Sequence, residues 1–461
     1  MEITSSKSED LFLRLPDDII ESIVFILPIK DATVDEDPLQ QKRLLFVIRV
    51  NNLMSLWHGS KVNVFRVHFS LGREFTPQLD QWITDAVNMG ALHTLDINLS
   101  FGLHPYCEAY YGNHEKFYDF PSRLLTKEKF STIRHLTLKC CNLTPSCSFD
   151  GLVSLKSLAL DIVTLTGSFL KDMLSHGLEL EQLSLKRLRM DRDCKLNIDL
   201  SKLKYLAIVD CERLRGININ GAVELNEFFF AGKHEYCSFK NVPKLVNVSF
   251  NCNTDDDYGG VLNVLTKFGH RLPQLEILNL HGRTPYIVRS DVIPQAFKVF
   301  PNLKYLELAA NSFDNDILWI AYLLKFLPLL EELHLVADVV RQIRKPTKSN
   351  HKNLRILHLE GFCGNIIELE LTLHVLKRCK ALEKIVIDPS SKFLFGGDTW
   401  GQREDRKPWE IWKPMEIQRW LSREIPKGVQ LCHQMGIWSS GMILALGARG
   451  PEFDSRNAPF I

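Results

Sequence analysis

The chain lacks the features by which several large classes of protein are recognised. Of its 461 residues, 56 are Lys or Arg and 55 are Asp or Glu, so it has no excess of positive charge for binding nucleic acid or a membrane surface. Its apolar runs all fall short of the roughly eighteen residues that suggest a transmembrane helix. We therefore expect neither nucleic acid nor a membrane among its partners.

Signals of catalysis and of metal binding are also missing. The sequence contains no G-x-x-x-x-G-K-[ST] phosphate loop, no G-x-G-x-x-G, no G-x-S-x-G elbow and no H-E-x-x-H helix. Its 15 histidines are dispersed, and the acidic run at residues 255–257 is not followed by further ligands at EF-hand spacing. We expect no enzymatic activity, no metal and no cofactor.

The use of cysteine indicates a reducing compartment. The 11 cysteines are odd in number and form no C-x-x-C pair, and some, such as Cys141 and Cys211, stand where the repeat described next needs a small buried residue. Residues 1–10 are polar and acidic, which is typical of a disordered leader and unlike a signal peptide. We expect a protein of the cytoplasm, the nucleus or both.

The chain does contain one repeated sequence motif. In residues 133–143 the apolar residues follow the pattern L-x-x-L-x-L-x-x-N/C-x-L, and its middle leucine, Leu136, recurs at steps of 20 to 30 residues. The recurrences are Leu155/Leu158/Leu160, Leu180/Leu183/Leu185, Leu203/Leu206/Ile208, Leu225/Phe228/Phe230, Leu245/Val248/Phe250, Leu275/Leu278/Leu280, Leu303/Leu306/Leu308, Leu330/Leu333/Leu335, Leu354/Leu357/Leu359 and Leu382/Ile385/Ile387.

This repeated motif predicts an α/β fold, a leucine-rich-repeat solenoid shaped like a horseshoe, over residues 61–350. Alternation of leucine and polar residues predicts a short strand with its leucines on one face. One repeat cannot bury that face alone, so neighbouring repeats must stack into a continuous core. Because the strand side and the connecting side differ in width, the stack bends and the strands line its concave face.

The polar neighbours of the leucines should point into the hollow, where a protein substrate could bind. For any one of them the alternative is a solvated residue without a contact, because binding energy concentrates in a few side chains. The candidates are His135, Thr137, Lys139, Asp161, Gln182, Lys186, Tyr205, His281, Tyr305, Glu307, His334, His358 and Glu360.

Near the N-terminus, residues 11–32 suggest one short amphipathic helix that starts near Pro16 and stops at Pro28. Residues 15–32, which read L-P-D-D-I-I-E-S-I-V-F-I-L-P-I-K-D-A, resemble the opening of a plant-type F-box. In that family the box binds a Skp-type adaptor and so joins a cullin-RING ubiquitin ligase. The resemblance assigns to the adaptor Leu15, Pro16, Ile19, Ile20, Ile23, Leu27 and Pro28.

The box departs from the family after Ala32. The family continues with a second helical part of the type R-T-S-V-L-S-K-R-W-R-x-L-W, whereas residues 33–43 read T-V-D-E-D-P-L-Q-Q-K-R. We therefore interpret residues 11–34 as a partial F-box and residues 35–60 as a connector and a helix, with a hinge at residues 35–43. Alternatively, the apolar residues of this segment cap the first repeat.

A second resemblance to a known family lies at the C-terminal end of the repeats. Residues 353–362, 368–371, 381–389 and 419–431 resemble the FBD segment of plant F-box leucine-rich-repeat proteins, so residues 351–433 are interpreted as an FBD region and 434–461 as a loose tail. The leading hypothesis is a substrate receptor of an SCF-type ubiquitin ligase, a subunit without catalysis of its own. The alternative is a leucine-rich-repeat interaction scaffold that is not coupled to a ligase.

Overall fold

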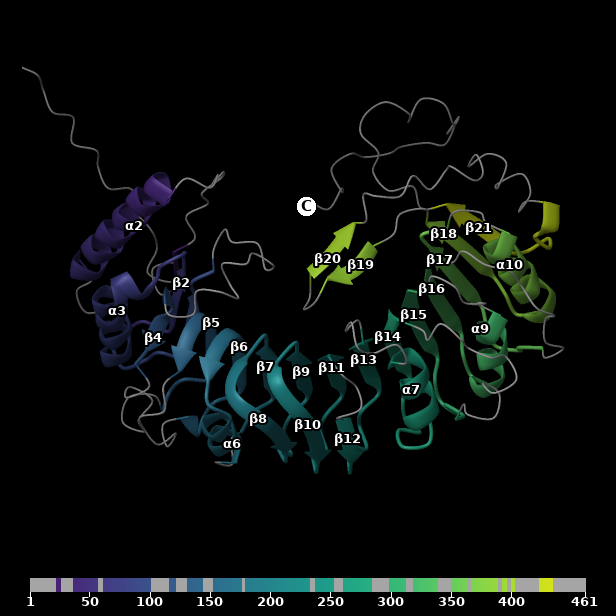
Figure 1. The fold of residues 1–461 in the computed structure, drawn as a ribbon, viewed down its shortest axis with the longest axis horizontal. Coiled ribbons are helices and arrows are strands. Elements are labelled where there is room, and N and C mark those ends of the chain that lie inside the picture. Colours follow the sequence, from purple (N-terminus) through teal and green to yellow (C-terminus); the bar gives the residue numbers. More distant parts are fainter. Residues whose placement is uncertain are drawn as a thin grey trace, which may run out of the picture.

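The chain forms a curved wall of strands with helices along its outer side, seen in the computed structural model of Figure 1. The structure describes residues 22–25, 36–56, 61–100, 116–121, 131–143, 152–175, 179–232, 237–252, 260–283, 298–311, 318–338, 350–362, 366–388, 392–395, 399–402 and 423–433. In this part of the chain, none of the helices has the length and apolar character needed to cross a membrane.

The inner side of the wall is one continuous ladder of parallel strands. In spatial order they are β1 (Ser22–Phe25), β2 (Val64–His68), β3 (Thr94–Asn98), β5 (His135–Leu143), β6 (Ser157–Leu165), β7 (Gln182–Lys186), β9 (Tyr205–Val209), β11 (Glu227–Ala231), β13 (Asn247–Cys252), β14 (Ile277–Arg283), β15 (Tyr305–Asn311), β16 (Glu332–Asp338), β17 (Ile356–Glu360), β18 (Lys384–Asp388) and β21 (Gln430–His433).

The leucines of neighbouring inner strands are in register. Leu278 of β14 pairs with Leu306 of β15, which pairs with Leu333 of β16, and all three are at most 1% exposed. Each strand therefore gives its leucines to one shared core, as the alternating pattern predicts. The predicted α/β leucine-rich-repeat solenoid is confirmed.

A second ladder lies on the outer side of the first repeats. Its strands are β4 (Tyr118–Phe120), the second halves of β5 and β6, then β8 (Arg189–Ile198), β10 (Glu212–Asn220) and β12 (Cys237–Lys240). The chain turns from the inner to the outer ladder at one corner residue per repeat, and that residue has a positive φ at Cys140, Ile162, Arg187 and Asp210. The next corner is Gly232, where φ is 141°, a conformation that is open essentially to glycine alone.

The length of each repeat decides what covers its outer side. The 20- to 23-residue steps from Leu183 to Val248 carry the outer strands β8, β10 and β12, whereas the longer steps that end in β14, β16 and β18 carry helices. In these three repeats a helix precedes the inner strand. The helices are α2 (Glu36–Leu56), α3 (Thr76–Asn88), α6 (Gly167–Ser175), α7 (Gly260–Lys267), α9 (Leu318–Leu323) and α10 (Ile366–Arg378), with short 3-10 turns η2 (Arg73–Phe75) and η7 (Leu324–Phe326).

The helix predicted for residues 11–32 is wrong at Ser22–Phe25, which form β1. This strand pairs in parallel with β2, Ile23 opposite Phe65, so it extends the inner ladder at its N-terminal edge. The physical reason is that the edge of β2 offers a row of backbone partners to a β-branched and aromatic Ile-Val-Phe segment. The other residues assigned to the adaptor lie outside the described residues: Leu15, Pro16, Ile19, Ile20, Leu27 and Pro28.

The hinge predicted at residues 35–43 is also wrong, because α2 runs from Glu36 to Leu56 without a break. Acidic residues and Pro38 at its start are a helix-initiation signal, since a first turn favours negative charge and tolerates proline. The helix is anchored on the first repeat, where the ring of Phe46 stacks on that of Phe69 at 4.3 Å. It is thus packed against the first repeat of the solenoid.

At the C-terminal end, the inner ladder continues through β17 and β18 to β21. The segment that resembles the FBD therefore supplies the last strands of the same sheet. Between β18 and β21 a separate antiparallel hairpin, β19 (Lys392–Phe395) and β20 (Thr399–Gln402), lies in the opening of the horseshoe in the view of Figure 1. The leader at 1–10 and the tail at 434–461 lie outside the described residues.

Candidate functional site

All residues predicted to line the hollow lie on inner strands, at positions that alternate with the buried leucines. They are His135, Thr137 and Lys139 in β5, Asp161 in β6, Gln182 and Lys186 in β7, Tyr205 in β9, His281 in β14, Tyr305 and Glu307 in β15, His334 in β16, and His358 and Glu360 in β17. Their positions follow the pattern, and contact with a substrate stays a prediction.

Parallel register places these side chains in rows that cross the strands. One row contains Glu307, His334 and His358, which pair in that order on β15, β16 and β17. The neighbouring row contains Glu360 on β17, opposite Val336 on β16, and His281 on β14, opposite Ala309 on β15. Titratable groups far apart in sequence thus gather at the C-terminal half of the concave face.

Five of these residues with Tyr305 form what we call the histidine–glutamate cluster: His281, Tyr305, Glu307, His334, His358 and Glu360. Glu307 lies between two imidazoles, with its Oε1 3.0 Å from His281 Nε2 and its Oε2 3.5 Å from His334 Nδ1. The other ring nitrogen of His334, Nε2, is 3.1 Å from Glu360 Oε2. These four side chains are 8 to 15% exposed, so water screens their interactions poorly.

The ion pairs determine the protonation states of Glu307 and His334. Burial by itself would raise the pKa of Glu307, but hydrogen bonds from His281 and His334 outweigh it and hold that pKa well below its usual range. Burial would likewise lower the pKa of His334, yet hydrogen bonds to Glu307 and Glu360 raise it to about 9. His334 is therefore an imidazolium at neutral pH, and it donates from both nitrogens.

The remaining two members extend the cluster along the sheet. The Tyr305 hydroxyl is 3.0 Å from Glu307 Oε2, and burial together with the Glu307 charge raises the pKa of this phenol above its usual value. The His358 ring stacks on that of His334 at 4.0 Å, and burial and the His334 charge lower the pKa of His358. His358 Nε2 is buried without a hydrogen-bond partner.

The N-terminal half of the concave face carries a second ion group, which we call the arginine–aspartate cluster: Lys139, Asp161 and Arg187. Arg187 binds Asp161 through Nε at 2.9 Å and Nη2 at 2.6 Å, and Lys139 Nζ lies 3.3 Å from the same carboxylate. Arg187 is absent from the sequence-based candidates because it follows β7 at the corner. Its positive φ of 49° accompanies that turn, and its side chain meets Asp161 on the neighbouring strand β6.

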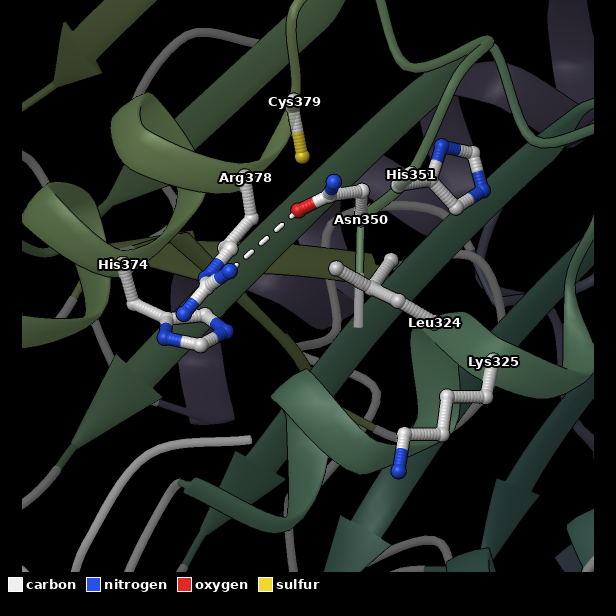
Figure 2. A pocket seen from close by; sticks show the side chains of 7 residues that line it. All are labelled: Leu324, Lys325, Asn350, His351, His374, Arg378 and Cys379. Carbon is white, nitrogen blue, oxygen red and sulfur yellow. Dashed lines mark hydrogen bonds between the residues drawn. The ribbon is translucent and has the colours of Figure 1, made fainter. Parts of the chain in front are cut away.

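Other candidate sites are weaker. In the described ranges, no three His, Cys, Asp or Glu side chains are arranged to hold a metal ion. Figure 2 shows a pocket on the outer side, lined by Leu324, Lys325, Asn350, His351, His374, Arg378 and Cys379. Its enclosed part has room for roughly one water molecule. Lys325 and Arg378 end helical segments, where basic residues offset the helix dipole, so this pocket needs no ligand to explain it.

Comparison with known proteins agrees with the fold. A search of curated proteins finds no match. A family model described as At1g61320/AtMIF1, LRR domain, matches residues 54–431, which span the solenoid from the end of α2 to β21. The matched range is most of the chain, and the chain therefore belongs to the At1g61320/AtMIF1 leucine-rich-repeat domain family.

Proposed function

We propose that this protein is an interaction scaffold that binds a partner protein on its concave face. The observation that carries the proposal is the unbroken inner ladder from β2 to β21, which buries apolar residues on one side and presents rows of polar and charged residues on the other. Such an extended concave surface suits a protein partner better than a small molecule. We propose further that it has no catalytic role and acts in the cytoplasm or nucleus.

Site-specific crosslinking tests this proposal. The photoreactive amino acid benzoylphenylalanine is placed at Thr137 or Ser249 on the inner strands, or at Asn218 on the outer strand β10 as a matched control. We expect both inner positions to capture the same protein from an extract and the outer position to capture none. The captured protein, once purified, should bind the chain, and Ser249→Arg should weaken binding at least about tenfold because it places bulk and charge in the interface.

Two outcomes would contradict the scaffold proposal. One is that adducts form equally at Asn218 and at the inner positions. The other is that Ser249→Arg leaves the affinity unchanged while Asn218→Arg lowers it. Both results would move the interface off the concave face.

The resemblance of residues 15–32 to an F-box supports a second candidate function, that of a substrate-recognition subunit in an SCF-type cullin-RING ubiquitin ligase. The family match begins at residue 54 and does not bear on this segment. A helix that binds a Skp-type adaptor and the strand β1 both need residues 22–25, so the two arrangements exclude each other. Adaptor binding would therefore have to free the edge of β2.

A binding assay with purified Skp-type adaptor tests this second function. If it holds, we expect the full chain to retain the adaptor and Ile19→Asp to abolish retention, because a charge would enter the apolar stripe. Leu44→Asp is a matched control, since Leu44 is 50% exposed on α2. Absence of retention by the unaltered chain would leave the scaffold as the only proposed function.

A further inference from the structure

The two halves of the concave face carry opposite charge. We count Lys, Arg, Asp and Glu alone on the described inner strands and at their corners. From β2 to β7 the cations are Arg66, Lys139, Lys186 and Arg187 and the carboxylates are Asp96 and Asp161, an excess of two positive charges. From β9 to β18, among the side chains that the structure describes, the carboxylates are Asp210, Glu227, Glu307, Glu332, Glu360 and Asp388 and the cation is Lys384, an excess of five negative charges.

The local ion groups repeat this difference. In the arginine–aspartate cluster, one carboxylate lies between two cations, Lys139 and Arg187. Asp96 lies 3.6 Å from Arg66 and 2.9 Å from the His68 ring. In the histidine–glutamate cluster two carboxylates, Glu307 and Glu360, share His334 between them, and none of the six members is Lys or Arg. Counting Lys, Arg, Asp and Glu alone, the first cluster has one positive charge in excess and the second has two negative charges.

The strands between the two clusters are uncharged in their middle row. Ala207, Phe229 and Ser249 follow one another there on β9, β11 and β13. Asp161 on β6 and His334 on β16 are separated by seven strand steps in the ladder, which at about 4.8 Å each is roughly 34 Å along the sheet. This is far beyond the screening length of about 8 Å at physiological salt, so the two charges act separately.

We propose that the concave face binds a dipolar partner, one whose basic patch docks on β14–β18 and whose acidic patch docks on β5–β7, across strands whose middle row is uncharged. This inference rests on the proposed scaffold function and adds the chemistry of the partner. A partner of one sign is attracted by one half and repelled by the other, whereas a dipolar partner gains at both ends and is held in one orientation.

Two fluorescent peptides of identical composition test the inference. The block peptide has four glutamates, a Gly-Ser linker of about twelve residues and four lysines, so that the linker can span the two halves. The mixed peptide alternates the same charges around the same linker. By fluorescence anisotropy at low salt, we expect the block peptide to bind about tenfold more tightly, and the difference to vanish near 0.5 M salt because both ends are then screened.

Charge-reversal variants test which side chains produce the preference for the block peptide. Glu332→Lys on β16 and Lys186→Glu on β7 should each reduce the preference for the block peptide at least about threefold. Asp193→Lys and Arg192→Glu make the same charge changes on the outer strand β8, where the side chains are 61% and 84% exposed, and should leave the preference intact. Equal binding of the two peptides, or equal losses in the β8 variants, would overturn the inference. Crosslinks on the inner strands would still support the scaffold in that case, whereas their absence would remove the scaffold as well.

Discussion

Replacing His334 with glutamine is expected to lower the free energy of unfolding by about 2 to 4 kcal/mol at pH 7. Glutamine carries no charge, so Glu307 and Glu360 would face each other without the imidazolium that now bridges them at 3.5 and 3.1 Å. Both carboxylates are at most 15% exposed, and water cannot replace the lost partner fully. Urea denaturation followed by circular dichroism measures the difference.

The same residue should make stability depend on pH in the alkaline range. Because the pKa of His334 rises from 6.5 to about 9 on folding, its contribution is fully present below pH 6.5 and is lost as the pH rises through 9. The loss should be on the order of 2 to 3 kcal/mol in the unaltered chain and absent in His334→Gln. The pKa of Glu307 is lowered on folding, so its contribution disappears at the opposite, acidic end.

His358→Gln provides the matched control for this prediction. The pKa of His358 is lowered on folding, so this histidine favours unfolding below pH 6.5 and has no effect in the alkaline window. An alkaline loss that persists in His334→Gln, or that disappears in His358→Gln, would contradict the assignment of the imidazolium to His334.

Phe250→Ala is expected to destabilise the solenoid by about 3 to 5 kcal/mol. Phe250 is 1% exposed and lies among Phe228, Phe230 and Phe268, with ring centroids 5.3 to 6.1 Å away. Removing the ring leaves a cavity at the centre of the stack, because three neighbouring rings cannot all move into it. The chain depends on nearest-neighbour stacking, so the damage reaches the repeats on both sides.

Two further variants, measured by the same urea denaturation, should each lose less stability than Phe250→Ala. Phe250→Leu keeps most of the volume and should cost less than about 2 kcal/mol. Phe229→Ala removes an equal ring from the neighbouring strand β11, at a position that faces the hollow and is partly exposed. It should therefore destabilise the chain less than Phe250→Ala. If Phe229→Ala proved as costly as Phe250→Ala, the two faces of β11 and β13 would have to be assigned differently.

The leucine spacing alone determined the solenoid, the phase of each inner strand and the face on which each polar residue lies. These are local properties, since alternation along a strand separates core from surface whatever the rest of the chain does. Repeat length is also related to what stands on the outer side, because the steps of 25 to 30 residues that contain α6, α7, α9 and α10 have room for a helix, whereas the steps of 20 to 23 residues carry a strand.

Tertiary structure decided the contacts between repeats and the fate of the N-terminal segment. Glu307 meets His281 and His334, which are 26 and 27 residues away, only because neighbouring strands are aligned in register. Arg187 reaches Asp161 from a corner that lies outside the strand pattern. Residues 22–25 carry the spacing of an amphipathic helix, yet they pair with β2, because an unpaired sheet edge competes for the backbone and that competition is invisible in any local pattern.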